Sequence, residues 1–270
     1  MERLAPTRRA PAQRCSDRAL LLRRFPFGES SLVVHALTRE HGRIAVLAKG
    51  AYRPSSGFFA VLDLFDTLEL RWSARPGQEL GLVSGAVLVV RRPAIPGDLE
   101  NYRAALGLLE LAGLAAREGH EERGLFGWLE EALDLLQRGK SPPGLIQAAF
   151  DLSFLRVVGL TPSLERCASC GQRPGAGSRG ASFSRSAGGR LCSRCAGEAR
   201  ALGRAVEVLP LNLVRVAESL MVATPAMLEH TRIEFDLLAR VREFVERFLE
   251  YHLETRLRSR RRAAPPRNTP

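Results

Sequence analysis

Two pairs of cysteines constrain the central part of this chain more than any other feature of the sequence. Cys167 and Cys170 form one C-x2-C pair, Cys192 and Cys195 form a second, and 21 residues separate the two pairs. Each pair can wrap a turn around one side of a metal ion, and four thiolates together complete a closed tetrahedral site. A closed site leaves no position for a substrate, so the spacing predicts a structural zinc ion and not a catalytic one.

The segment between the pairs supports this reading. It is rich in glycine and offers little apolar material for a core, so we expect metal binding to hold residues 163–200 together. A pair of disulfides is the weaker alternative, because four of the five cysteines stand in metal-binding spacing and fit a reducing compartment. Cys15 is expected to be an unpaired thiol near the N-terminus.

The charge of the chain indicates an anionic partner. Its 270 residues carry 40 basic and 29 acidic side chains, a formal net charge of +11. Residues 1–80 hold 13 basic and 8 acidic side chains, and residues 256–270 hold 6 basic and none acidic, whereas the predicted helical regions are slightly acidic. Residues 161–200 are also basic, with 7 basic and 2 acidic side chains. The high net charge favours binding to nucleic acid or to another anionic surface.

The first third of the chain predicts a small β-barrel. Short β-rich runs cover residues 20–24, 31–37, 43–49, 61–72 and 80–90, with turn residues between them and no intervening helix. Leu62, Leu64, Leu68 and Leu70 alternate with polar residues, as expected for a strand with one buried face. Five strands within about seventy residues favour the five-stranded OB-fold.

The remainder predicts an α-helical part with the zinc segment inserted, so the fold class is α+β and multidomain. Helical periodicity begins after residues 91–97, which we interpret as a hinge. The predicted divisions run as follows: a disordered N-terminal extension 1–17, an OB-fold domain 18–92, a helical domain 93–162, a zinc-binding segment 163–200, C-terminal helices 201–258 and a disordered basic tail 259–270.

A nucleic-acid-binding barrel needs cations along one groove and flat side chains on which bases can stack. The sequence offers a set of candidates in or beside the predicted strands: Arg23, Arg24, Arg39, Arg43, Lys49, Tyr52, Arg53 and Arg71. Lys49, Tyr52 and Arg53 bring two cations and an aromatic ring to one strand end. Phe58 and Phe59 follow closely, and the sequence leaves open whether each belongs to the barrel core or to the binding surface.

The last helix runs directly into a basic tail. Arg256, Arg258 and Arg260 fall near helical spacing and predict a basic face at the helix end, where cations also suit the helix dipole. An acidic peptide or phosphate groups are the partners that such a face would bind. A solubilising disordered tail is the alternative.

No catalytic residues are predicted. The chain lacks a phosphate-binding G-x-x-x-x-G-K-[ST] loop, a G-x-S-x-G elbow and an H-E-x-x-H motif. His120 with Glu122 ahead of Cys167 resembles a zinc-deaminase pattern, but Arg166 replaces the expected proline and the second cysteine pair supplies surplus ligands. We also find neither a secretory signal nor an apolar run of membrane-spanning length, and therefore expect a cytoplasmic, nucleoid-associated protein.

Three stretches of the chain resemble the RecO family of bacterial recombination mediators. Residues 24–50 (RFPFGESSLVVHALTREHGRIAVLAKG) resemble the first barrel strands of the family, and residues 248–260 (FLEYHLETRLRSR) resemble its final helix. The cysteine pairs lie where many members carry a zinc motif. Residues 1–17 and the tail after Arg262 depart from the family pattern, and neither supports a transferred role.

This resemblance implies a function. RecO proteins bind single- and double-stranded DNA, anneal complementary strands, associate with RecR, bind the acidic C-terminal tail of the single-strand-binding protein SSB, and help to load RecA onto SSB-coated strands. The expected function is that of a non-enzymatic mediator, with SSB recruited through Arg256, Arg258 and Arg260. The alternative is a zinc-ribbon scaffold protein of transcription or translation that lacks annealing activity.

Overall fold

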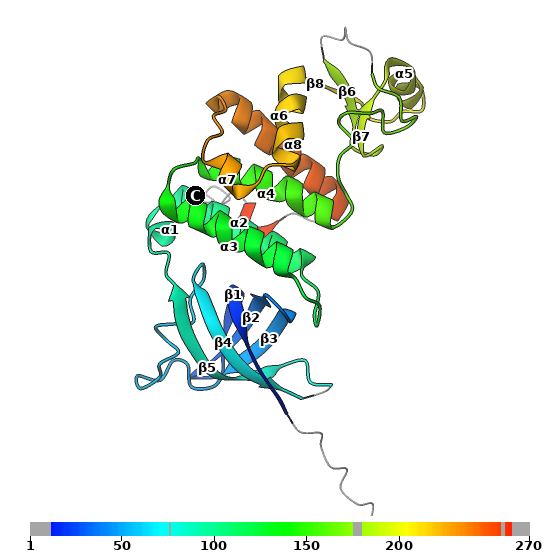
Figure 1. Cartoon of the computed structure of the whole chain (residues 1–270). Helices are drawn as coiled ribbons and strands as arrows, with labels where there is room; N and C mark the ends of the chain where they lie inside the picture. The colour runs from blue at the N-terminus through cyan, green and yellow to red at the C-terminus, as the bar shows by residue number, and fades with distance from the viewer. Residues whose placement is uncertain (1–11, 76, 175–179, 255–256, 261–270) are drawn as a thin grey trace, which may run out of the picture. The chain divides into compact units, whose positions relative to one another are not determined.

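The chain forms two compact units, which we describe separately from a computed structural model (Figure 1). The described residues are 12–75, 77–174, 180–254 and 257–260. Unit 1 comprises residues 1–93 and 112–130, and unit 2 comprises residues 94–111 and 131–270. The predicted helical domain 93–162 therefore contributes to both units.

Unit 1 contains a closed five-stranded barrel whose strands are paired mostly in antiparallel orientation. The strands are β1 (Gln13–Phe27), β2 (Ser31–Thr38), β3 (Gly42–Ala48), β4 (Thr67–Ala74) and β5 (Gly81–Val90). They close in the order β1-β2-β3-β5-β4, with β4 returning to β1 and a short parallel pairing between β3 and β5 (Figure 1). Leu68 and Leu70 of β4 point into the core, as the predicted alternation requires, and so does Trp72. The strand begins at Thr67, so Leu62 and Leu64 belong to the connection that precedes it. The five-stranded OB-like prediction is thus confirmed.

The first strand begins earlier than the sequence indicated. β1 starts at Gln13 and pairs with β4 from Gln13↔Ala74 to Leu20↔Thr67, so residues 13–17 belong to the barrel and not to a disordered extension. The side chains of this segment are mostly polar and gave no apolar alternation. Residues 1–11 lie outside the described part of the chain. The C-terminal half of β1 pairs instead with β2, from Ala19↔Thr38 to Phe27↔Ser31, with an irregularity between Leu21 and Arg23.

Residues 112–130 cover one part of the barrel's outer surface. Arg43 on β3 donates from Nη1 to the carbonyl of Gly113 (3.1 Å) and from Nη2 to Oε1 of Glu118 (3.1 Å). Gly42 has a positive φ of 67° and lies directly against the carbonyl groups of Arg117 and His120, so a side chain would not fit there. These contacts fix the segment on the barrel beside the β2–β3 turn.

The long β3–β4 connection, residues 49–66, is held by two arginines that follow β5. Arg91 Nη2 donates to the carbonyl of Ala60 (2.7 Å). Arg92 is fully buried and donates from Nη1 to the carbonyl of Phe65 (2.7 Å) and to Thr67 Oγ1 (3.0 Å). The first two residues of the predicted hinge, Arg91 and Arg92, are therefore held in place. Their hydrogen bonds also fix the end of the β3–β4 connection that leads into β4.

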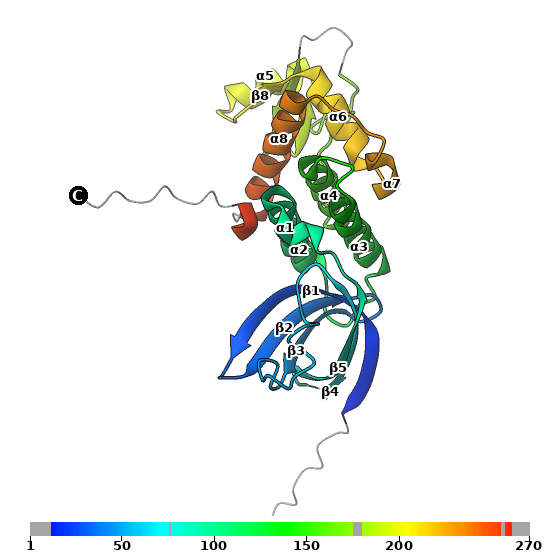
Figure 2. The ribbon, with the colours of Figure 1, turned by 90° about the vertical axis from the view of Figure 1, so that its left-hand side faces the viewer.

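Unit 2 is mainly helical. Its helices, and those shared with unit 1, are α1 (Ala94–Gly97), α2 (Leu99–Ala115), α3 (Arg123–Arg138), α4 (Pro143–Val157), α5 (Ser193–Ala201), α6 (Leu211–Met221), α7 (Pro225–Leu228) and α8 (Phe235–Leu253). The N-terminus of α2 is capped by Asp98, whose Oδ1 accepts a hydrogen bond from the amide of Asn101 (2.8 Å). Helix α4 is almost wholly buried and packs against α6, α7 and α8 (Figure 2).

A small three-stranded sheet carries the cysteine-rich segment. Its strands are β6 (Ala181–Ser184), β7 (Gly189–Leu191) and β8 (Glu207–Leu209), in the order β7-β6-β8. Phe183 of β6 is fully buried, and its ring centroid lies 5.0 Å from that of Phe244 and 5.9 Å from that of Phe248 on α8. This aromatic contact attaches the sheet to the helices of unit 2.

The start of the tail is ordered, which corrects the prediction that residues 259–270 are disordered. Leu257 is buried and is followed by the 3-10 helix η1 (Arg258–Arg260). Ser259 Oγ donates a hydrogen bond to Oε2 of Glu110 on α2 (2.7 Å). The two residues are 149 positions apart in the sequence, so no local sequence pattern could predict this contact. Residues 261–270 lie outside the described part. Among the described residues, no helix combines the length and the apolar character needed to cross a membrane.

Candidate nucleic-acid interface and metal centre

The outer face of β1, β2 and β3 carries several of the predicted cations. Register pairs place Arg23 opposite His35, Phe25 opposite Val33 and Phe27 opposite Ser31, so these side chains share one face of the ribbon. The intervening residues Leu32 and Val34 are buried in the barrel core. The same face continues on β3, where Leu47 pairs with Val33 and Ala45 pairs with His35. The odd-numbered positions of these strands therefore form an outward surface.

Cations stand at both ends of this surface. Arg43 lies at the start of β3, and Lys49 follows the end of that strand with an exposed side chain. Six residues of extended chain separate these two positions by roughly 20 Å. Arg23 is exposed on β1 between them. Arg43 Nη2 lies 3.1 Å from Glu118 Oε1, which offsets part of its charge, so we expect Arg23 and Lys49 to contribute most to binding a phosphate backbone on this face.

The β3–β4 connection adds Tyr52 and Arg53 beside the β1–β2 turn. The amide of Tyr52 donates to the carbonyl of Ser30 (2.9 Å), and the amide of Gly50 donates to Ser31 Oγ (3.3 Å). Gly50 adopts a positive φ of 66°, and the Arg53 side chain lies across it, 3.2 Å from where a β-carbon would be. Lys49, Tyr52 and Arg53 are all exposed. The structure thus brings this predicted trio together at one end of the outer face.

Three other predicted residues lie apart from this trio. Arg24 shares the register of the buried Val34, yet its side chain is 42% exposed; Nη1 donates to the carbonyl of Leu62 (3.1 Å) and Nη2 lies 3.1 Å from Asp63 Oδ1. Arg39 follows β2 at the end remote from Ser31, and its Nε lies 3.6 Å from Glu40 Oε1. Arg71 is on β4, opposite Gly85 of β5, and so on a different side of the barrel. DNA binding by these three arginines stays a prediction.

Exposed aromatic rings are a feature of this region that the sequence reading largely missed. Phe25 is 42% exposed and Phe27 is 56% exposed at the end of β1, in a stretch that the sequence placed between two predicted strands. Phe59 is 67% exposed and its ring centroid lies 6.1 Å from that of Tyr52, whereas Phe58 packs against the barrel core. A proline within a strand marks an unpaired edge, and this signal could have identified the exposed rings.

The charged residues of the outer face affect the pKa of His35. Partial burial lowers the pKa of the His35 imidazole, and the positive charges of Arg43 and Arg23 lower it further, against a smaller opposing effect of Glu118. The ring of His35 also makes an edge contact with Phe25, at a centroid distance of 5.6 Å. The positive charges of Arg23 and Arg43 therefore both act at His35 on the outer face.

The four predicted metal ligands converge in unit 2. The Sγ atoms of Cys167, Cys170, Cys192 and Cys195 all lie within 4.8 Å of one another. The Sγ atoms of Cys170 and Cys192 are 3.8 Å apart. Zinc–sulfur bonds of about 2.3 Å in a tetrahedron place sulfur atoms about 3.8 Å apart, so the cluster has the dimensions to hold such an ion.

Local backbone structure creates this convergence. The first pair sits in a turn that is closed by a hydrogen bond from the amide of Gly171 to the carbonyl of Cys167 (2.8 Å), with Gly171 at a φ of 73°. Cys192 is the N-cap of α5 and Cys195 lies in the first turn of that helix. The amide of Ala168 donates to the carbonyl of Arg190 (2.7 Å) and fixes the first turn against β7.

The cysteine thiols differ in acidity. Burial opposes ionisation of Cys167, but hydrogen bonds from the backbone amides of Cys192, Cys170 and Ser169 outweigh it and lower the pKa of this thiol to about 6. A hydrogen bond with Cys192 and burial raise the pKa of Cys195 to about 12. Cys167 therefore ionises more readily than Cys195.

The three arginines predicted to bind an acidic peptide do not share one environment in the structure. Arg256 lies outside the described residues. Arg258 is exposed, and its backbone amide donates to Glu110 Oε1 (2.9 Å). Arg260 is turned inward and pairs with Asp151, its side chain only 10% exposed. Arg260 is therefore a structural residue in this conformation, and the helical spacing that suggested a shared basic face is broken by the 3-10 turn.

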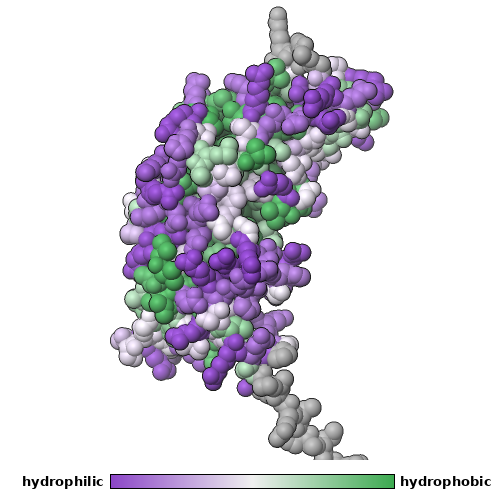
Figure 3. Space-filling model, viewed as in Figure 1, coloured by the Kyte–Doolittle hydropathy of each residue, from purple (hydrophilic) through white to green (hydrophobic). Residues whose placement is uncertain are grey.

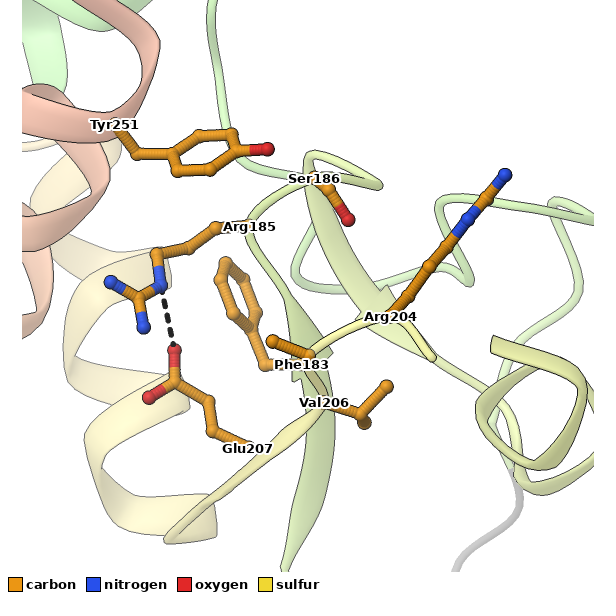
Figure 4. A pocket seen from close by; sticks show the side chains of 8 residues that line it. Phe183, Arg185, Ser186, Arg204, Val206, Glu207 and Tyr251 are labelled. Atoms are coloured by element: carbon orange, nitrogen blue, oxygen red, sulfur yellow. Dashed lines mark ion pairs between the residues drawn. The ribbon is translucent and has the colours of Figure 1, made fainter. Parts of the chain in front are cut away.

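A cavity of about 660 Å³ lies beside the cysteine-rich sheet (Figure 4). Phe183, Arg204, Val206 and Tyr251 contribute to its lining, and the carboxylate of Glu207 pairs with Nε of Arg185 at 3.5 Å. On the face drawn in Figure 3, hydrophilic residues predominate and hydrophobic ones gather in a few separate patches.

Comparison with known proteins identifies the family. The model described as Recombination protein O N terminal matches residues 13–91, and Recombination protein O C terminal matches residues 96–261. A DNA repair protein RecO of Anaeromyxobacter sp. (strain K) is 35% identical over 250 residues, covering 90% of this chain and 92% of that protein. The DNA repair protein RecO of Myxococcus xanthus (strain DK1622) is 31% identical over 249 residues, covering 92% and 96%. The chain therefore belongs to the RecO family.

Proposed function

We propose that this protein is a DNA-binding recombination mediator that binds and anneals single strands and helps to load a recombinase onto SSB-coated DNA. Membership of the RecO family supports a role in DNA repair and recombination. The observation that carries the DNA-binding part is the outer face of β1–β3, where Arg23, Lys49 and Arg53 accompany exposed aromatic rings. Such a face combines phosphate neutralisation with surfaces for base stacking, the two contributions on which OB-folds depend.

Annealing follows from holding a strand by its backbone. A strand whose phosphates are bound by separate cations is neutralised, and this reduces its repulsion from a complementary strand. Bases that rest on exposed rings, and that are not enclosed in a pocket, stay open to pairing. The protein would therefore act by binding and orientation, without bond-making chemistry.

We propose that zinc occupies the four-cysteine cluster as a structural ion. A tetrahedral tetrathiolate is coordinatively closed, which suits a role in stabilising the small sheet β7-β6-β8 and in fixing it against α8. In this proposal the ion supplies folding free energy to unit 2 and takes no part in DNA contact.

The protein partners come from the family resemblance. We propose RecR, the acidic C-terminal tail of SSB and, indirectly, RecA. Arg258 is the described candidate for the acidic tail, because its side chain is exposed in η1. Arg256 stays a candidate on sequence alone.

A strand-annealing assay tests the function directly. Complementary labelled oligonucleotides should anneal faster with the protein than without it. The protein should also anneal strands that are coated with SSB, and a free SSB-tail peptide should inhibit this second activity. Binding without acceleration of annealing would refute the mediator function. Absence of both binding and annealing would favour the zinc-ribbon scaffold of transcription or translation.

A further inference from the structure

Four exposed aromatic side chains gather around the β1–β2 turn. Phe25 and Phe27 end β1, and Tyr52 and Phe59 belong to the β3–β4 connection. We call these four residues the aromatic platform. The phenylalanines are notable because none is needed for the core, which is filled by residues such as Leu21, Val34 and Trp72. An exposed ring costs solvation free energy that burial elsewhere would have avoided.

The two parts of the platform are held together by the backbone. Phe27 pairs in register with Ser31, whose Oγ accepts a hydrogen bond from the amide of Gly50 (3.3 Å). The carbonyl of Ser30 accepts from the amide of Tyr52 (2.9 Å). Gly28 has a φ of 61°, which lets the turn reverse within a few residues. The connection therefore begins directly beside the ring-bearing turn.

The far end of the connection is also fixed. Phe58 packs into the barrel core, the amide of Leu62 donates to the carbonyl of Phe58 (2.9 Å), and Arg91 holds the carbonyl of Ala60 (2.7 Å). Phe59 stands between these anchored positions, with its ring 6.1 Å from that of Tyr52. The rings are thus presented on restrained backbone, which reduces the entropy that binding would otherwise cost.

Cations flank the platform, and their placement favours a nucleic acid as its occupant. Lys49 and Arg53 are exposed on the same connection, and Arg23 has the same register face as Phe25 and Phe27. A purely apolar partner would have to leave these charges desolvated. A polyanion with flat apolar rings satisfies both the charges and the platform.

Resting on the proposed DNA binding, we infer that the aromatic platform makes this interface selective for unpaired strands over duplex. The reason is geometric. Phosphates are available to cations in both forms, but the faces of the bases are covered by their neighbours in a duplex and become accessible in a single strand. The cations therefore contribute to both affinities, whereas the platform contributes only to the single-strand affinity.

The test compares full-length variants by fluorescence anisotropy at one salt concentration. The probes are an oligothymidine of about 15 nucleotides, a length that an OB-fold can cover, and a blunt duplex of the same length. The variants are the doubles Phe25→Ala/Phe27→Ala, Tyr52→Ala/Phe59→Ala and Lys49→Ala/Arg53→Ala. Phe235→Ala is the matched control, because Phe235 is 82% exposed on α8 in unit 2. Thermal melting of each variant checks that the barrel is intact.

We expect each platform double to weaken oligothymidine binding about fivefold or more for each ring that carries a base, and to leave duplex binding within twofold, roughly the level of an energetically neutral surface change. Restoring rings as Phe25→Trp/Phe27→Trp should recover the single-strand affinity. The charge double should weaken both probes, and Phe235→Ala should weaken neither.

The outcomes separate this inference from the proposed function. If wild-type protein binds both probes and the platform doubles bind oligothymidine as tightly as wild type, the selectivity inference is wrong while DNA binding stands. An equal loss on both probes contradicts the inference in the same way. If wild-type protein binds neither probe, the proposed function and the inference fall together.

Discussion

Arg260 Nη2 lies 2.6 Å from Asp151 Oδ1, in an ion pair whose side chains are only 10% and 4% exposed. Burial raises the pKa of Asp151, and Arg260 is the nearby cation that most opposes this rise. The pair joins the η1 turn to helix α4 across 109 residues. Together with Glu110 of α2, which accepts hydrogen bonds from the amide and hydroxyl of Ser259, it attaches η1 to helices α2 and α4.

Replacement of Arg260 by alanine should destabilise unit 2 by about 3–5 kcal/mol, because it leaves the Asp151 carboxyl buried without its cation. Chemical denaturation monitored by circular dichroism measures the change. Replacement of both residues, as Arg260→Met with Asp151→Leu, should cost less than the single change. Arg247→Ala is the matched control, since Arg247 forms an exposed pair with Glu243 at 2.6 Å, and we expect it to cost under about 1 kcal/mol. If Arg260→Ala were as stable as Arg247→Ala, the Arg260–Asp151 pair would not contribute to the stability of unit 2.

Loss of Lys49 and Arg53 together should weaken DNA binding and flatten its salt dependence. Each lost phosphate contact on a single strand reduces the log–log slope by about 0.7, so the double alanine variant should show a slope less negative by about 1.4. Titrations at several salt concentrations give the slope. Arg240→Ala/Arg247→Ala removes the same charge from α8 and should change it little. An unchanged affinity and slope in the Lys49/Arg53 variant would remove these residues from the interface.

Much of the barrel could be predicted from sequence, because its signals are local. The alternation around Leu68 and Leu70 is such a signal, and both residues are fully buried. The distribution of cations could not be predicted. A register shift between Leu21 and Arg23 decides that Arg23 faces outward with His35 whereas Arg24 has the inward register of Val34. A shift of this kind reverses the face of every residue after it and leaves no mark in composition.

The metal cluster and the tail show the same contrast. The cysteine spacing predicted the ligand set because each C-x2-C pair is a local turn, and the four Sγ atoms converge within 4.8 Å. The pairing of Asp151 with Arg260 depends on how α4 and the end of α8 pack, and no short-range pattern encodes it. Helical spacing beyond Leu253 therefore suggested an exposed basic face where the chain forms a buried contact.

Removal of the metal should unfold the cysteine-rich sheet and spare the barrel. If zinc is bound, its loss should cost about 4 kcal/mol where free zinc exceeds the dissociation constant a thousandfold. Elemental analysis should give one zinc per chain in the wild type and in Cys15→Ser, whose cysteine is outside the cluster, and less in Cys192→Ser. DNA binding by the barrel should partly survive in Cys192→Ser. A melting temperature unaffected by chelation would contradict a structural role for the ion.

The pKa of His35 should report both the stability of unit 1 and occupancy of the outer face. Because burial, Arg43 and Arg23 lower this pKa in the folded state, the unfolded chain takes up the proton more readily. The contribution of His35 is therefore fully present above its unfolded pKa, about 6.5, and is lost as pH falls through the folded value. Denaturation at several pH values should show this loss in wild type and a smaller one in His35→Gln.

Bound phosphates should reverse part of this shift. They would offset the charges of Arg23 and Arg43 and so raise the pKa of His35, which means that binding takes up protons and strengthens as pH falls through the range between the bound and the free pKa. NMR titration of the imidazole with and without oligothymidine measures the change directly. Arg23→Ala should raise the pKa in the free protein and reduce the further rise on binding. A His35 pKa that is identical in free and bound protein would place the strand away from β1–β3, because a phosphate backbone on that face cannot leave the field at His35 unchanged.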